Sequence, residues 1–232
     1  MHVPHAFQID RTASLKFALE RGFGLACAGD GGKPVASPVP FHLSYAQDGT
    51  PVVAFHVARH NPLAALADGK TSWLLAVQGD DAYVSSDWYA SAHQVPTWLY
   101  QAVHLSGPVR PMGGEELATH LNSLSDRFER DLLPKPIWTM DKVPAARREG
   151  LMRAIVGLVM TVEDVHGSFK LNQHKSDADH LAVATALGQR PSPGAQAIAR
   201  EMRAMRPQVF AGFVQPHDMG GSSAAGLVEE TM

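Results

Sequence analysis

Cysteine is almost absent from this sequence: Cys27 is the only one among 232 residues, so no disulfide can form within the chain. A chain of this kind suits a reducing compartment. Residues 1–20 lack the charged and then apolar pattern of a secretory signal peptide. No stretch approaches the roughly 20 uninterrupted apolar residues that cross a bilayer. We therefore expect a cytoplasmic protein that has no membrane partner.

The chain also lacks a strong excess of either charge. Twenty Lys and Arg residues face 23 Asp and Glu residues, which gives a net charge of −3 and a pI near 6.4. This balance offers no broad basic surface for neutralising nucleic-acid phosphates. No helix-turn-helix pattern is visible either. DNA binding through a small local patch stays open.

Several common enzyme motifs are missing. The glycine-rich segment "AGDGGKP" (28–34) has Pro34 where a P-loop needs Ser or Thr, and no G-x-G-x-x-G follows a predicted strand. His56 and His60 are four residues apart in or just after a predicted strand, where that spacing does not place both on one face as it would on a helix. No G-x-S-x-G elbow supports a hydrolase. We predict no metal site and assign no catalytic residue.

What the sequence does contain is a series of short β-type segments joined by turn residues. Strands are predicted at 23–29, 33–46, 50–58, 71–78, 81–89, 97–107 and 155–165, with tight turns at 29–32, 47–49 and 78–81. Pro34, Pro38 and Pro40 indicate that the second of these is an edge or interrupted strand. Hairpin-linked strands without long crossovers predict a mainly β protein, an antiparallel barrel or sandwich, with flanking helices.

Helical patterns frame these strands. A first helix is predicted after Asp10 or Thr12 as N-cap and ends at Gly22. An amphipathic helix is predicted over 114–133, and another opens at Pro144. The apolar stripe of the helix predicted over 114–133 consists of Leu117, Leu121, Leu124, Phe128 and Leu132. The predicted organisation is a β domain over 1–170, a short helical C-terminal extension of two helices over 171–206, and a Gly/Ser-rich tail over 207–232.

Two polar segments are candidates for ligand binding. In "FHVARHNP" (55–62), Arg59, His60 and Asn61 bring donors to the point where a strand meets a helix start, which suits a phosphate. A solvated loop with a capping Asn is the alternative. In "SFKLNQHKSD" (168–177), Lys170, Asn172 and Gln173 could address a heteroaromatic edge, or could belong to a polar loop.

An aromatic group lies between these segments, over 82–98. Tyr83, Trp88, Tyr89 and Trp98 form a packing cluster or a surface for a flat ligand. The strand that follows, "VPTWLYQAVHLSG" (95–107), has an apolar face and a second face that is aromatic and polar. Gln101 and His104 point to opposite sides of this strand unless it is bulged.

Taken in order, several segments resemble the PaiB family of FMN-binding negative transcriptional regulators. They are "MHVPHAF", "ASPVPFHL", "FHVARHNP", "QGDDAYVSSDWY", "VPTWLYQAVHLSG" and "IVGLVMTVEDVHGSFKLNQHKSDAD". The resemblance spans about residues 1–185. It implies an FMN-binding split β-barrel, antiparallel and Greek-key-like, related to the pyridoxamine-phosphate oxidases and flavin reductases. It also implies a homodimer with FMN in a groove between the subunits.

The resemblance also implies which residues bind the cofactor. Arg59, His60 and Asn61 fall where related barrels bind the FMN phosphate. The flavin groove is expected to involve Gln101, His104, Lys170, Asn172 and Gln173, with His104 the residue expected to face it. Asn172 departs from the Ser that is usual in the family and keeps a polar group there.

Three functions stay open on this basis. The first is a regulator that represses transcription, either by binding DNA or through another regulator. The second is a flavin-dependent oxidoreductase that uses the same groove, either an FMN reductase or an oxidase. The third is a haem-binding barrel with His104 or a C-terminal histidine as ligand.

Overall fold

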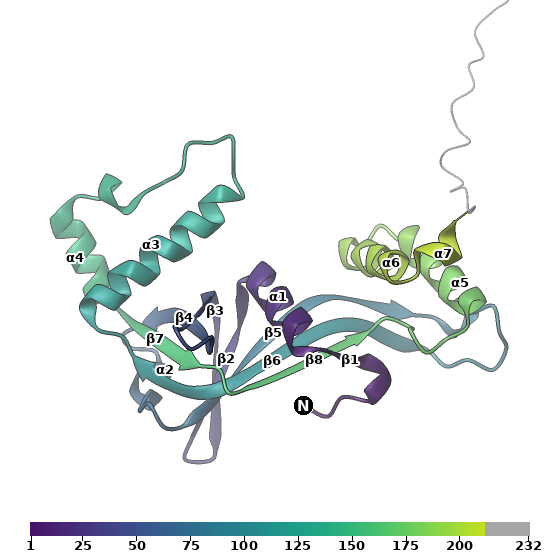
Figure 1. Ribbon diagram of the computed structural model, residues 1–232, viewed down its shortest axis with the longest axis horizontal. Helices are drawn as coiled ribbons and strands as arrows, with labels where there is room; N and C mark the ends of the chain where they lie inside the picture. Colours follow the sequence, from purple (N-terminus) through teal and green to yellow (C-terminus); the bar gives the residue numbers. More distant parts are fainter. Residues whose placement is uncertain (212–232) are drawn as a thin grey trace, which may run out of the picture.

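A computed structural model describes residues 1–211, and its centre is one antiparallel sheet that closes on itself (Figure 1). The strands are β1 (Gln8–Ile9), β2 (Phe23–Asp30), β3 (Lys33–Tyr45), β4 (Pro51–Ala58), β5 (Ser72–Val84), β6 (Thr97–Pro111), β7 (Ile155–Thr161) and β8 (Asp164–Lys170). Their order is β1-β8-β6-β5-β2-β3-β4-β7, and β7 also pairs with β6. That last pairing closes a barrel, so the predicted antiparallel barrel is confirmed.

Strand β6 pairs first with β8 and then with β7 along its length. It pairs with β8 from Tyr100 to Ser106 and with β7 from Val109 to Pro111. Gly107 lies at the changeover, where a Cβ atom would come 1.8 Å from the carbonyl oxygen of Thr161. Only glycine therefore lets the β7–β8 connection cross β6 so closely. We call β1, β8 and the portions of β5 and β6 that extend past the barrel the ribbon.

Three details of the strand prediction were wrong. The strand predicted at 81–89 ends at Val84, and a 3-10 turn follows it over Ser86–Trp88. The polar residues at 78–81 do not form a hairpin, because both halves of β5 pair with β6 and the register shifts between Gln78 and Asp81. Turn-type residues here make a β-bulge inside one long strand. The segment 155–165 is not one strand, since the chain crosses β6 after Thr161 and continues as β8. The turns at 29–32 and 47–49 are confirmed.

The prolines of β3 lie where the prediction of an edge or interrupted strand requires them. Pro34, Pro38 and Pro40 all lie in the part of β3 that pairs with β2. Pairing with β4 begins only at Phe41. In this part of β3 the other edge has no neighbouring strand, so the missing N–H groups of the prolines cost no hydrogen bond. Such an unpaired edge is where sheets tolerate proline.

The helices agree with the sequence patterns, with small differences at their ends. They are α1 (Arg11–Arg21), α2 (Pro62–Leu66), α3 (Gly114–Arg130), α4 (Ala145–Arg153), α5 (Asp177–Gly188), α6 (Pro193–Met205) and α7 (Pro207–Phe210), with 3-10 turns η1 (His5–Phe7), η2 (Ser86–Trp88) and η3 (Met140–Lys142). Asp10 caps α1 by accepting from the Ala13 N–H at 2.7 Å, and Gly22 ends it with φ 58°. Leu132 lies beyond the end of α3 and is exposed.

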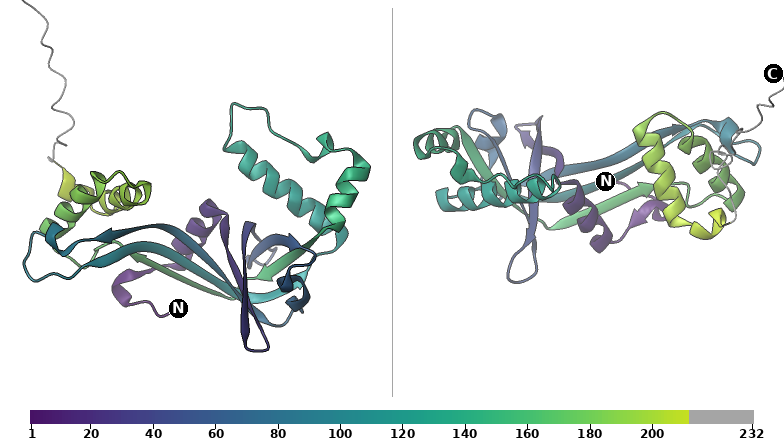
Figure 2. Two further views of the ribbon diagram at one scale, coloured as in Figure 1. Left: turned by 180° about the vertical axis from the view of Figure 1, so that it is seen from behind. Right: turned by 90° about the horizontal axis from the view of Figure 1, so that it is seen from above.

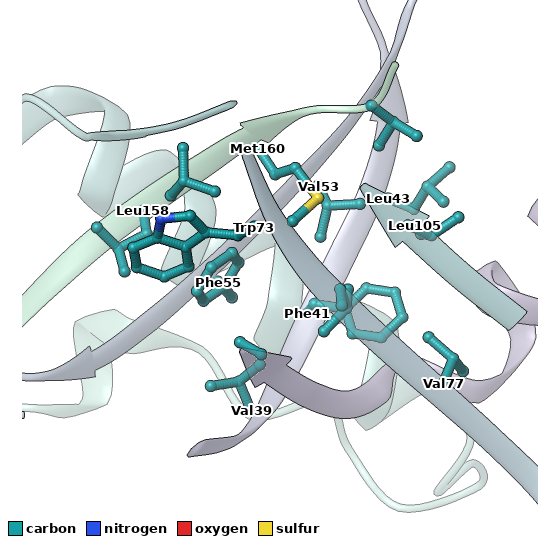
Figure 3. Close-up of a cluster of buried hydrophobic side chains, with 14 of the residues drawn as sticks. Val39, Phe41, Leu43, Val53, Phe55, Trp73, Val77, Leu105, Leu158 and Met160 are labelled. Atoms are coloured by element: carbon teal, nitrogen blue, oxygen red, sulfur yellow. The ribbon is translucent and has the colours of Figure 1, made fainter. Parts of the chain in front are cut away.

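Two separate cores hold the molecule together. The barrel core gathers side chains from β2 to β7 and α1, including Phe41, Phe55 and Trp73 (Figure 3). The ribbon core lies between α5, α6 and one face of β5 and β6, with Leu99 and Leu187 fully buried. Phe169 of β8 packs against both. No helix among residues 1–211 is long and apolar enough to cross a membrane.

The two cores support helices at the two ends of the molecule. α3, α4 and their connecting loop stand over one end of the barrel, and α5 to α7 stand over the far end of the ribbon (Figures 1 and 2). α7 occupies the start of the predicted tail, and residues 212–232 lie outside the described part of the chain.

Candidate functional site

The predicted phosphate residues lie together where β4 ends and α2 begins. The Arg59 side chain donates from Nε to the carbonyl oxygen of Arg153 and from Nη2 to that of Ile155, at 2.5 and 2.9 Å. Its Nη1 group makes no hydrogen bond within residues 1–211. Asn61 caps α2 by accepting from the Leu63 N–H at 3.0 Å. The loop is thus held at both ends, while donors of Arg59 and the exposed His60 ring face solvent.

Gln101 and His104 lie on opposite faces of β6, as the alternation of a strand requires. Gln101 is 7% exposed and points to the side covered by α1, next to the bulge at Gly79. His104 is opposite Ala76 of β5 and His166 of β8, on the side away from α1. Of the two predicted residues, His104 is therefore the one on an accessible surface.

The side of the sheet that carries His104 is largely bare of helices and presents a group of apolar and aromatic side chains, with Gln78, Asp81 and Ser106 among them. We call it the outer face and define it by Phe23 and Leu25 of β2, Leu74, Ala76 and Tyr83 of β5, and Trp98, Tyr100, Ala102 and His104 of β6. Helices α1, α5 and α6 lie on the other side (Figure 1). Phe23 is 53% exposed and Trp98 56%, and the rings of Tyr83 and Trp98 meet edge to face at 6.0 Å. Large apolar side chains gathered in the open mark a binding or interaction surface.

His104 has an environment that keeps its ring neutral. Partial burial lowers its pKa, and the positive charges of the Met1 amino group and His166 lower it further. A neutral imidazole can donate from one nitrogen and accept at the other, which suits the edge of a heteroaromatic ring. No sequence pattern marks His166, because only the register of β6 against β8 brings it opposite His104.

The three cofactor residues predicted at the end of β8 and just after it differ in their contacts. The Lys170 ammonium donates to the Thr97 hydroxyl at 2.5 Å and lies 5.9 Å from the centre of the Phe7 ring. Asn172 is fully buried at φ 60°, with its side chain 3.4 Å from the Tyr89 hydroxyl. Gln173 bonds its own turn, donating to the carbonyl oxygen of Phe169 and accepting from the Leu171 N–H.

The predicted residues form two groups that are far apart in one chain. Lys170 lies opposite Tyr100 of β6, whereas Arg59 lies beyond Pro111 because its N–H donates to Ala154, ahead of β7. The strand from Tyr100 to Pro111 has a contour length of roughly 36 Å at about 3.3 Å per residue. That length is well beyond an FMN molecule. Because β6 bends through the barrel, this length is an upper limit on the straight-line separation, and the two groups lie at different ends of the strand.

A cluster of histidines lies under α3, on the outside of the barrel. His56 Nδ1 and His120 Nε2 are 3.1 Å apart, and His42 is close enough to lower the pKa of His120. Desolvation is the main cause, and the pKa of His120 falls to about 4. Within residues 1–211, no group of three or more His, Cys, Asp or Glu residues is arranged to hold a metal ion.

Residues 1–164 match the protein family described as "Putative FMN-binding domain". The chain is also 30% identical over 203 residues to "Protease synthase and sporulation protein PAI 2" of Bacillus subtilis, covering 87% of this chain and 96% of that protein. The chain belongs to the PaiB family of FMN-binding proteins. FMN is accordingly its cofactor, which confirms the expectation drawn from the sequence motifs.

Other similarities agree with the PaiB assignment. An uncharacterised protein of Saccharomyces cerevisiae is 30% identical over 100 residues, covering 40% of this chain and 59% of that protein. The FAD- and haem-binding protein of Mycobacterium smegmatis has a similar structure, with a TM-score of 0.51 and 19% identity, over 70% of this chain and 73% of that one. This likeness shows a shared flavin-protein fold, the split barrel.

Proposed function

We propose that this PaiB-family protein is a homodimer that binds FMN between its two copies, against their outer faces. The separation of the two groups of predicted cofactor residues carries the proposal. The residues around Lys170 are expected to contact the flavin ring, and those around Arg59 to bind the phosphate. If the first set in one protomer faces the second set in its partner, both sets reach the same flavin. A two-fold axis then produces two such sites at once.

The outer face has the chemistry that an FMN ring and a second copy both need. Exposed apolar and aromatic side chains, among them Trp98, Tyr83 and Phe23, offer walls to a flat ring and a core to a dimer interface. Phosphate and ring edge also need donors, and Arg59, His60, His104 and Lys170 are at least partly exposed. The residues present therefore fit the cofactor.

Within this proposal the eight residues have different roles. Arg59 and His60 hold the phosphate, and Asn61 orients their loop by capping α2. His104 and Lys170 contact the ring system. Asn172, Gln173 and Gln101 act as positioning residues, since their side chains are buried or bonded to their own turn or face the inside of the sheet.

We further propose that the FMN-loaded dimer is a cytoplasmic regulator that represses transcription, through DNA or a second regulator. The similarity to the Bacillus subtilis protein, named for protease synthesis and sporulation, supports a regulatory role. The slightly acidic net charge favours a regulator partner over broad DNA contacts. Bound FMN supplies redox chemistry, and the protein places and tunes it.

A complementation experiment tests the shared site. Arg59→Ala and Lys170→Ala chains with different affinity tags are co-expressed, and the mixed dimer is isolated through both tags. If each site takes Arg59 from one copy and Lys170 from the other, the mixed dimer has one intact site and one doubly changed site. Absorbance near 450 nm should then return to about half the wild-type FMN content, while each variant alone binds little.

Three results would contradict the proposal. A mixed dimer without flavin would place both residues in a within-chain site. If both variants fold and keep their full FMN content, the two residues do not belong to the site. Thermal unfolding checks that the variants are folded. A monomeric mass in light scattering would show that the protein is not a dimer. Bleaching of the bound flavin by NADPH would instead favour the oxidoreductase over the regulator.

A further inference from the structure

A cavity with two chambers lies between α3, α4 and the loop that joins them, away from the outer face. None of the eight predicted FMN residues lines it, although Arg59 donates to the carbonyl oxygen of Ile155 in its wall. The inner chamber has a volume of about 360 Å³, and its walls include Leu121, Trp138, Val143, Leu151 and Ile155. The volume falls within the range of small-molecule sites. The inner chamber therefore suits a compact apolar group.

The second chamber adjoins the first and has polar and charged side chains among its walls. Its volume is about 400 Å³, and it shares Met140, Arg148 and Met152 with the inner chamber. Asn122 and Thr139 add hydrogen-bonding groups, and Asp141 adds a carboxylate. A ligand that fills both chambers has an apolar end inside and a polar end at Arg148.

The two charged side chains of the second chamber, Arg148 and Asp141, have opposite signs and are not paired with each other. The Arg148 side chain makes no hydrogen bond or ion pair with any residue in the range 1–211, although its charge helps to lower the pKa of Asp141. A hydrogen bond from Thr139 is the main cause of that lowered pKa. Lys142 also contributes, but its ammonium donates to the carbonyl oxygen of Ile137. A free guanidinium therefore stands near an ionised carboxylate.

We infer that this cavity binds an α-amino acid with a large apolar side chain. The carboxylate of the ligand pairs with the Arg148 guanidinium, a geometry that allows two parallel hydrogen bonds. Its ammonium group faces the Asp141 carboxylate, and its side chain fills the inner chamber beside Trp138. A simple fatty acid would leave Asp141 without a cationic partner and close to a second negative charge.

Titration of the FMN-loaded protein with L-phenylalanine tests the inference. Trp138 lines the inner chamber, so a saturable change in tryptophan fluorescence is expected, and Trp138→Phe should remove it. Calorimetry should give at least tenfold weaker binding for hydrocinnamate, which lacks the ammonium, and for phenethylamine, which lacks the carboxylate. Glycine lacks the apolar side chain and should bind at least as poorly.

Matched variants separate the charge contribution from general damage to α4. Arg148→Met should weaken phenylalanine binding at least tenfold, whereas Arg147→Met, an exposed neighbour on the same helix, should leave it unchanged. FMN content should stay at the wild-type level in both, which keeps this test independent of the flavin site. Equal binding by wild type and Arg148→Met, tighter binding of hydrocinnamate, or no saturable binding at all would overturn the inference.

Discussion

The barrel and the ribbon bury similar kinds of side chains but close their cores in different ways. In the barrel, β6 and β7 pair and complete a ring of strands, so the interior is enclosed by hydrogen-bonded backbone. In the ribbon, one face of β5 and β6 is covered by α5 and α6, and the outer face stays open. A closed barrel satisfies its edges by itself, whereas an open sheet leaves a surface for a partner.

This difference indicates that the barrel and the ribbon have different roles. The barrel supplies rigidity and fixes the ends of its strands, including the Arg59 loop at the start of α2. The ribbon carries the exposed rings of Tyr83 and Trp98 together with His104 and Lys170, and so provides the larger part of the proposed flavin surface. Phe169 packs against both cores and is the side chain that joins them directly.

The largest effect is expected where β6 passes from one region to the other. Gly107→Ala places a Cβ atom 1.8 Å from the carbonyl oxygen of Thr161, so the crossing must move and both cores lose their alignment. We expect a loss of more than about 4 kcal/mol in the free energy of unfolding, or no folded protein. Gly29→Ala is the control, because nothing lies within 4 Å of a Cβ there. A Gly107→Ala protein of wild-type stability in urea would show that the crossing is adaptable.

Substitutions inside each core should separate the two regions. Phe55→Ala in the barrel and Leu187→Ala in the ribbon both remove fully buried side chains. Losses of about 3–5 and 2–5 kcal/mol are expected in urea unfolding. Hydrogen exchange should rise throughout the protein for Phe55→Ala but chiefly over α5 and α6 for Leu187→Ala. The double variant should be additive within about 0.5 kcal/mol, and strong coupling would mean one core instead of two.

Acid should weaken the barrel region through His120. Its pKa is about 4 in the folded protein and about 6.5 in the unfolded chain, so folding favours the neutral ring. This contribution is complete above pH 6.5 and is lost as the pH falls from about 6.5 to about 4, by roughly 3 kcal/mol in total. Urea unfolding across this range should show the loss in wild type and a flatter profile in His120→Leu. The exposed His5→Leu serves as control, and equal slopes for wild type and His120→Leu would exclude the role of His120.

The smallest effect is expected at the turn that leads from β8 into the ribbon core. Asn172 has φ 60°, and its side chain is 3.4 Å from the Tyr89 hydroxyl. Asn172→Ala adds backbone strain and removes that partner, for a loss of about 2 kcal/mol, whereas Asn172→Gly removes only the partner and should cost about 1 kcal/mol. Thermal unfolding of the two variants measures the difference. A glycine variant less stable than the alanine variant would show that the left-handed backbone is not the dominant constraint.

Local patterns in the sequence were sufficient for most elements. Asp10 and Gly22 predicted the ends of α1 because capping and left-handed termination depend on neighbouring residues alone. The same reasoning failed at 78–81, where Gly and Asp residues are compatible with a turn and with a bulge. Only the pairing partner decides between them, and that partner is β6, some twenty residues later in the chain.

The sequence by itself determined the class of fold, the family, the cofactor, and the fact that Gln101 and His104 face opposite ways. These follow from alternation, turn chemistry and ordered motifs, which are local properties of the chain. Only the tertiary structure decided that Asn172 is buried, that His166 stands opposite His104, and that Arg59 and Lys170 lie at different ends of β6. Strand register and barrel closure place residues that are far apart in sequence, and no local pattern encodes those distances.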